Sequence, residues 1–156
     1  METKKKTYSP MEFERAMAGF FGTSNYYEHK VTEDIKFLLT DGCNWIREAA
    51  EARWIFDDIK FLLTDGCNWI REAADARWLF DDILFNQLRP EIKGLPFQVW
   101  VLWKDEDNED RLWVLRCEDG NDNTVLVQML MEAIDFPIDE IRIWVVGGVA
   151  MLPSEY

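Results

Sequence analysis

One stretch is written twice in succession: Asp34–Asp57 reads DIKFLLTDGCNWIREAAEARWIFD, and Asp58–Asp81 reads DIKFLLTDGCNWIREAADARWLFD. The two positions that differ are Glu51 against Asp75 and Ile55 against Leu79. A solenoid would need about three or more drifting repeats to be stable, and this chain has two near-identical copies and no third. The letters therefore indicate one tandem duplication, natural or engineered, inside an ordinary domain.

The same letters are expected to fold differently in the two copies. In the first copy, the alternation over Ile35–Thr40 predicts a short strand, and Thr40 is a suitable N-cap for the amphipathic helix that follows. The second copy starts directly after helical residues, with no Gly or Pro to turn the chain. We therefore predict helix over Ile59–Thr64, with any break at Thr64-Asp65-Gly66. The segment 34–81 is expected to be a duplicated helical segment, and residues 41–88 are expected to form either one bent helix or a hairpin.

Length and composition indicate one domain over residues 1–156, with a flexible tail over Met1–Tyr8. The apolar content of 48% is ample for a core. No run of about 18 apolar residues is present, so we expect no membrane span, and we see no signal-peptide core. Three cysteines, two of them one residue duplicated, do not make a disulfide framework. A reducing, cytoplasmic location is the expectation that follows.

Outside the duplication, the chain predicts helix first and strands afterwards. Ser9-Pro10-Met11-Glu12 has the residues of a helix start, and this helix should run to about Phe21 before Gly22 ends it. Short turns separate the later segments, which makes them an antiparallel meander of about five strands. The fold class is therefore α+β, with helices packed on one sheet face. The expected strands are Pro96–Lys104, Arg111–Cys117, Val125–Met131, Ile141–Val146 and Val149–Leu152.

Several short motifs share their order with a known family. They are Gly22-Thr23, Tyr26-Tyr27 and His29; Thr40-Asp41-Gly42 or its copy Thr64-Asp65-Gly66; the WLFDDI of Trp78–Ile83; Asp135-Phe136-Pro137; and the terminal LPSEY of Leu152–Tyr156. This pattern resembles a family of small bacterial and phage-associated proteins classed as a domain of unknown function, over roughly Phe20–Tyr156. The resemblance implies one compact domain, no known activity and a single copy of the TDG-helix unit. The second copy departs from that pattern.

Motifs for catalysis or metal binding are missing from the sequence. His29 is the one histidine, and it lies in a polar run with no motif around it. There is no CxxC, HExxH, EF-hand loop or phosphate-binding loop. We expect no enzyme, no cofactor and no metal, with a small carboxylate-based enzyme as a third reading.

The net charge of −13 disfavours direct nucleic-acid binding, because that binding depends on Lys and Arg neutralising phosphates. An alternative function uses the charge instead: an acidic inhibitor from a mobile element that imitates nucleic acid towards a basic host protein. Between residues 105 and 122, eight acids face two arginines. The residues expected to form that surface are Asp105, Glu106, Asp107, Glu109, Asp110, Glu118 and Asp119.

The leading hypothesis is a non-enzymatic, intracellular interaction domain. It rests on a large apolar surplus beside the missing catalytic motifs. The second copy adds Trp69 and Trp78, and an apolar face without an intramolecular site must find another chain. We therefore expect a homodimer, with the extra helix exchanged between protomers.

Overall fold

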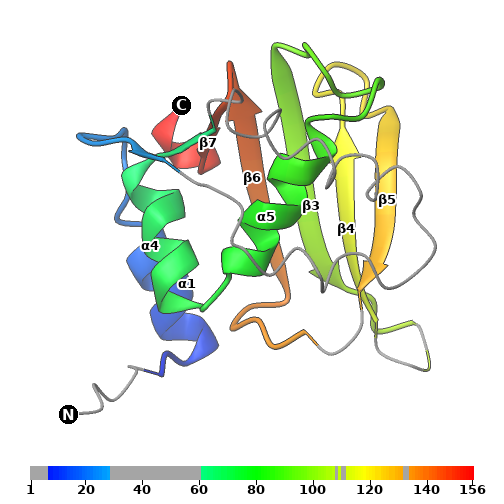
Figure 1. The fold of residues 1–156 in the computed structure, drawn as a ribbon. Helices are drawn as coiled ribbons and strands as arrows, with labels where there is room; N and C mark the ends of the chain where they lie inside the picture. The colour runs from blue at the N-terminus through cyan, green and yellow to red at the C-terminus, as the bar shows by residue number, and fades with distance from the viewer. Residues whose placement is uncertain (1–6, 29–60, 108, 110–111, 132–133) are drawn as a thin grey trace.

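The computed structural model of the chain describes residues 7–28, 61–107, 109, 112–131 and 134–156, and Figure 1 shows their arrangement. The helical elements are α1 (Pro10–Met17), α4 (Asp65–Ala73), α5 (Arg77–Asn86) and the 3₁₀ turn η2 (Pro153–Glu155). The strands are β1 (Tyr27–Glu28), β2 (Leu62–Leu63), β3 (Phe97–Lys104), β4 (Trp113–Glu118), β5 (Val125–Met131), β6 (Glu140–Val146) and β7 (Val149–Met151). The predicted α+β class is confirmed.

The sheet has seven strands in the described part of the chain, not about five, and its order is β1-β2-β7-β6-β3-β4-β5. A simple meander is therefore wrong. Only β3-β4-β5 is a meander, since β6 pairs with β3 and β2 runs parallel to β7. The stretch between Met131 and Glu140 allows this, because about eight residues can reach some 26 Å, more than the roughly 14 Å across three strand spacings.

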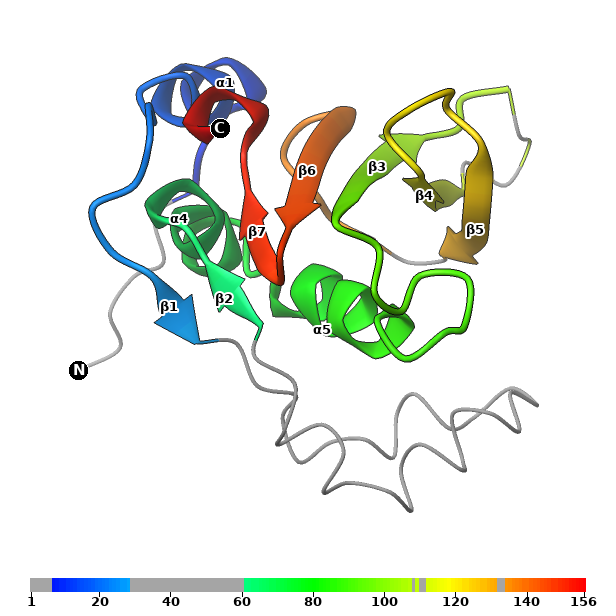
Figure 2. The same ribbon diagram turned by 90° about the horizontal axis from the view of Figure 1, so that it is seen from above.

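The core lies between α5 and one face of the sheet. Side chains alternate along each strand, so Trp100 and Leu102 of β3 and Ile143 of β6 face α5 and belong to the core. Figure 2 shows α5 beneath the central strands, while α1 and α4 lie at the β1-β2-β7 end. Phe13 of α1 joins the two helices to this core, with its ring centroid 4.9 Å from that of Trp69.

Helix α1 begins as predicted. Ser9 is the N-cap, Pro10 is the first helical residue, and the Ser9 hydroxyl and Glu12 carboxylate exchange hydrogen bonds with each other's backbone N–H groups. The helix ends at Met17 rather than near Phe21, whose side chain is exposed. Tyr8, expected in the flexible tail, packs edge-on against Phe13 and Trp69.

The start of the second copy forms a strand and not the helix that the sequence predicted. Leu62 and Leu63 form strand β2, paired with β1 on one side and β7 on the other, so the predicted helix over Ile59–Thr64 is wrong where the structure describes it. No Gly or Pro near the junction marks a turn in the sequence. The two neighbouring strands nevertheless supply backbone hydrogen-bond partners, and these outweigh the tendency of the helix predicted upstream to continue. The predicted strand over Ile35–Thr40 lies outside the described residues.

The break at Thr64-Asp65-Gly66 is where the sequence placed it. Thr64 caps α4, and the Thr64 hydroxyl accepts a hydrogen bond from the backbone of Cys67 at 3.4 Å. The buried carboxylate of Glu155 closes the same helix end, accepting from the Thr64 hydroxyl at 2.7 Å and from the Gly66 N–H at 3.1 Å. It also accepts from the Leu152 N–H at 3.0 Å. The TDG and LPSEY motifs are thus two halves of one structural contact.

The rest of the second copy forms a pair of helices rather than one bent rod. Asp75 takes a left-handed conformation (φ 51°) in the short link between α4 and α5. Ile70 and Leu79, on either side of it, are fully buried in the core. The second copy is therefore an integral part of the fold, and the premise that its apolar residues lack an intramolecular site is wrong.

Candidate interaction surface

The face of β3–β6 that points away from α5 is the most distinctive surface of the described chain. No helix in the described ranges covers its centre, as Figure 2 shows. Strand register places on it the side chains that alternate with the core residues. We call this surface the open face; its residues are Phe97, Val99, Val101, Trp103, Val114, Arg116, Glu118, Gln128, Leu130, Glu140, Arg142, Trp144 and Val146.

The open face has its own small apolar layer. Val99, Val101 and Val114 are buried, although they are not part of the main core. Their strand partners are larger: Arg116 and Arg142 flank Val101 on β4 and β6. Long side chains of this kind can cover apolar neighbours while their polar ends stay in water, which accounts for the burial of the valines without a covering helix.

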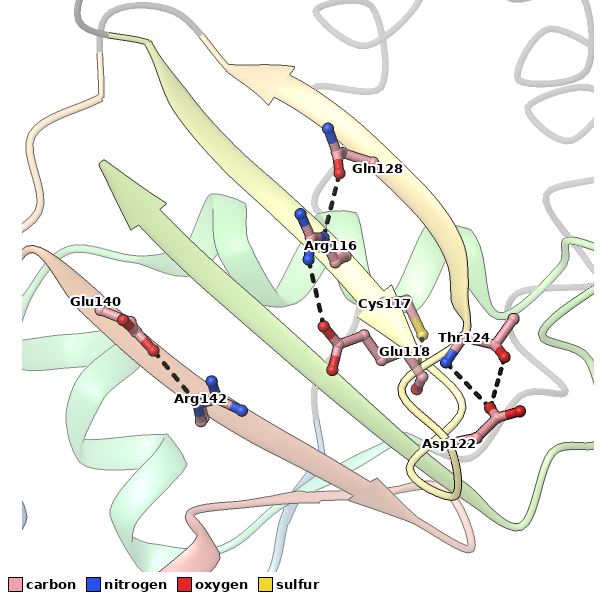
Figure 3. Close-up of polar contacts among 8 residues, drawn as sticks. All are labelled: Arg116, Cys117, Glu118, Asp122, Thr124, Gln128, Glu140 and Arg142. Atoms are coloured by element: carbon pink, nitrogen blue, oxygen red, sulfur yellow. Dashed lines mark hydrogen bonds and ion pairs between the residues drawn. The ribbon is translucent and has the colours of Figure 1, made fainter. Parts of the chain in front are cut away.

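Arg116 occupies the middle of this face (Figure 3). Its Nε donates to the Oε1 of Gln128 at 3.1 Å, and its Nη1 lies 3.5 Å from the Oε1 of Glu118. Its guanidinium carbon lies 4.6 Å from the centroid of the Trp103 ring. Stacking on an aromatic face and hydrogen bonding in one plane are what a guanidinium does and an ammonium does not. Arg116 is therefore held in place while remaining partly accessible.

A second ion pair lies on the neighbouring strand. Arg142 Nε is 3.3 Å from Glu140 Oε1, and both side chains are about half exposed, at 54% and 55%. An exposed pair of this kind contributes only about 0–1 kcal/mol to folding. Both groups are therefore free to change partners at little cost when another surface approaches.

Aromatic rings border the open face near the C-terminus. Phe97, Trp144 and Tyr156 pack edge to face, with ring centroids 5.2–6.1 Å apart. The Tyr156 ring is exposed (77%). Gly120, in the β4–β5 turn, packs closely against the Phe97 ring. A side chain at this position would collide with that ring. Together with Trp103, these rings give the open face a composition that is enriched at protein interfaces.

The acidic residues proposed from the sequence do not form one surface. Asp105, Glu106, Asp107 and Glu109 lie in the β3–β4 turn, and Glu118 and Asp119 lie at the other end of β4; Asp110 lies outside the described residues. Glu118 is buried beside Arg116. Asp119 accepts two backbone hydrogen bonds within its own turn, from Asn121 and Asp122. In the same turn, hydrogen bonding from the Thr124 hydroxyl, together with Asp119, lowers the pKa of Asp122.

The two tryptophans proposed from the duplication are half-buried against the main core. Trp69 is half-buried among Tyr8, Phe13 and Phe20. Trp78 packs edge-on against Phe136. Neither contributes to the open face.

The described residues offer little for nucleophilic or metal chemistry. Cys67 and Cys117 are buried free thiols; burial raises the pKa of Cys67 and raises that of Cys117 to about 12. Neither is a thiolate near neutral pH. No group of His, Cys, Asp and Glu in the described ranges could hold a metal ion, and His29 lies outside them. None of the helices in these ranges combines the length and apolar character that crossing a bilayer requires.

The carboxylates of the described helices and their links do not all gather around one hollow. A hollow of about 470 Å³ lies between Tyr8, Trp78, Asp75 and Asp135, and both aspartates are exposed at its rim. Burial, reinforced by the charge of Asp81, raises the pKa of Asp82 on α5 to about 7. Asp82 does not line this hollow. This hollow therefore does not bring together two buried, facing carboxylates of the kind that an acid–base pair needs.

Sequence reasoning missed the open face. Trp103, Arg116, Arg142 and Trp144 fall within expected strands and Glu140 directly precedes one, but none of them was assigned to a surface. The signal was present in Pro96–Lys104, whose two faces are both largely apolar: one face fills the core, and the other needs a second explanation.

Comparison with known proteins gives one match. The model of a family of unknown function (DUF6876) matches residues 59–156, which is 98 of 156 positions. The matched range contains the second copy except for its first residue and leaves out the whole first copy. No curated protein and no solved structure matches the chain. The matched range includes the Thr64-Asp65-Gly66 motif of the second copy and the terminal LPSEY.

Proposed function

We propose that this chain, which belongs to the DUF6876 family of unknown function, is a non-enzymatic interaction domain. It self-associates through the open face. The observation that carries the proposal is the composition of that face. It combines Trp103, Trp144, Arg116 and Arg142, and Trp and Arg are residue types that dominate binding energy at protein interfaces.

Charge favours a second copy of this chain as the partner. The whole chain carries −13, so two copies repel each other over most of their surfaces. The open face instead carries both signs in equal number, with Arg116 and Arg142 against Glu118 and Glu140. A two-fold axis near β6 would set Arg142 of each protomer against Glu140 of the other, which is the reciprocal pattern of an isologous dimer.

The expected dimer is weak. Four strands about 4.8 Å apart and about seven residues long give a face on the order of 400 Å² in plan. Stable interfaces bury about 800 Å² per partner, so the open face lies at the low end. We expect reversible association in the micromolar range.

Charge-reversal variants of Arg142 and Glu140 test the proposal. Arg142→Glu alone and Glu140→Arg alone should each shift light scattering and sedimentation towards the monomer, because each sets like charges against each other across the axis. An equimolar mixture of the two variants should associate again, as a heterodimer. A wild-type protein that stays monomeric at high micromolar concentration, or a mixture that does not associate, would contradict the proposal.

The alternative of an acidic inhibitor that imitates nucleic acid gains no support from a specific surface. Its residues are divided between the two ends of β4. A cytoplasmic location is part of our proposal and is supported by the free thiols of Cys67 and Cys117. Cell fractionation with a tagged chain would test it.

A further inference from the structure

The second copy occupies a slot between β1, β7, η2 and the loop before β1. The backbone N–H groups of Leu62 and Thr64 donate to the carbonyl oxygens of Gly148, just before β7, and of Ala150 in β7, each at 3.0 Å. Asp65 bonds to the loop as well: its carboxylate accepts from the Ser24 N–H at 2.8 Å, and its N–H donates to the Thr23 hydroxyl at 2.9 Å. Its entry strand and its helix start are therefore both held by other parts of the chain.

Gly66 is the position at which the slot most restricts the size of its occupant's side chain. A Cβ atom at Gly66 would lie 2.5 Å from Glu155 Oε1 and 2.7 Å from Leu152 Cδ1. The Thr64 hydroxyl must also reach Glu155, and Phe61, Leu63 and Cys67 must fit the core. A segment that fits needs apolar strand residues followed by Thr-Asp-Gly and an apolar helix face.

A second segment of the chain meets every one of these requirements. Residues 37–50 read FLLTDGCNWIREAA, letter for letter the sequence of residues 61–74. We propose that the slot is a docking site for either copy, so that residues 37–50 exchange with residues 61–74 as its occupant. Because the two occupants are identical, each makes the same contacts with β7, Glu155 and the core.

Chain connectivity permits the exchange. Glu28 pairs with Leu62, and after the exchange it would pair with Leu38 through a loop of nine residues, 29–37. Residues 51–74 would then lie between the first copy's helix and Asp75, where the chain resumes its present course into α5. The same 24 extra residues move from the β1–β2 connection to the α4–α5 connection, and loop-closure entropy changes only slowly with length.

The short link between α4 and α5 explains why the second copy holds the slot. Asp75 has φ 51°, in the left-handed region that Asp tolerates better than most residues with a side chain. With the second copy docked, the tight link around Asp75 is intact, and the N–H of Ala76 donates to Arg71 at 3.0 Å. The exchange opens this link, so the first copy is the minor occupant.

Glycine-to-alanine variants separate the two occupants. Gly66→Ala damages the second copy only, and the first copy should then take the slot. We expect the urea midpoint of Gly66→Ala to fall by less than half as much as that of the double variant Gly42→Ala/Gly66→Ala. Gly42→Ala alone is the matched control and should leave the midpoint unchanged.

Thiol labelling reports which copy is docked without relying on stability. Cys67 is fully buried in the docked second copy, and Cys43 is the same residue in the first. With Cys117 as the buried internal standard, mass spectrometry should show Cys67 labelled more slowly than Cys43 in the wild type. This order should reverse in Gly66→Ala.

Three results would overturn the proposal. Gly66→Ala could be as unstable as the double variant, with no reversal of labelling. The double variant could be as stable as the wild type, which would mean that the slot does not select glycine. A labelling reversal that depends on protein concentration would mean that the first copy of another chain fills the slot, and not that of the same chain.

Discussion

The carboxylate of Glu155 lies against the backbone of Gly66, with its Oε2 3.1 Å from the Gly66 nitrogen, although 89 residues separate the two in sequence. The contact works because a helix N-terminus has unpaired N–H groups and a positive partial charge. It also works because Gly66 has no side chain to keep the carboxylate away. The last strand and η2 are thereby attached to the first turn of α4.

Replacing Glu155 with Gln should destabilise the protein by about 2 kcal/mol, because a buried charged acceptor of three hydrogen bonds becomes a neutral group with one acceptor atom. Urea unfolding measures this directly. Glu72→Gln, at a highly exposed carboxylate (69%), is the control and should change stability little. Since Glu155 contacts whichever copy is docked, the first copy cannot compensate; an unchanged midpoint would mean that this contact does not support the fold.

Asp82 should make stability depend on pH. Its pKa rises from 3.8 to about 7 on folding, so folding favours the protonated carboxyl. The contribution of Asp82 to the free energy of unfolding should therefore be largest below pH 3.8, fall as the pH rises towards 7 and level off above that, a change of up to about 4 kcal/mol. Asp82→Asn should remove this slope and stabilise the protein at pH 8. Glu91→Gln, at an exposed position, should leave the slope intact.

Two glycines with the same backbone conformation allow a matched comparison. Gly120 and Gly94 have φ values of 79° and 81°. Ala at either position meets the left-handed penalty of about 1 kcal/mol, but at Gly120 the new methyl group also collides with Phe97, whereas at Gly94 it meets open space. Thermal unfolding should show Gly120→Ala to be the less stable variant by about 1–3 kcal/mol. Equal losses would mean that Phe97 moves aside freely.

Arg116 should matter more for association than for folding. Arg116→Lys keeps the charge but loses the planar stacking on Trp103 and the directed bond to Gln128. Sedimentation should show a severalfold increase in the dimer dissociation constant. Urea unfolding should give a free energy of unfolding within about 0.5–1 kcal/mol of the wild type. Arg71→Lys, on α4 and away from the open face, is the control and should associate normally. If both variants associate like the wild type, the open face is not the interface.

Signals that lie within a few residues of each other were readable in the sequence. The capping box joins Ser9 and Glu12, which are three positions apart, and the cap of Thr64 on Cys67 has the same separation. Strands β3 to β7 follow from alternation and turns. The α+β class needed nothing more, because helix and strand periodicities are local properties of the chain.

The sequence by itself determined these elements and the identity of the two copies, but it could not say where the second copy lies. The tertiary structure decided that, placing Leu62–Leu63 between β1 and β7, together with the pairing of β6 with β3 and the open face that results. The physical reason is separation along the chain. Thr64 meets Glu155 across 91 residues, and no local propensity reports such a contact. Ile35–Thr40 and Ile59–Thr64 have equal propensities, so where each lies is set by the groups around it.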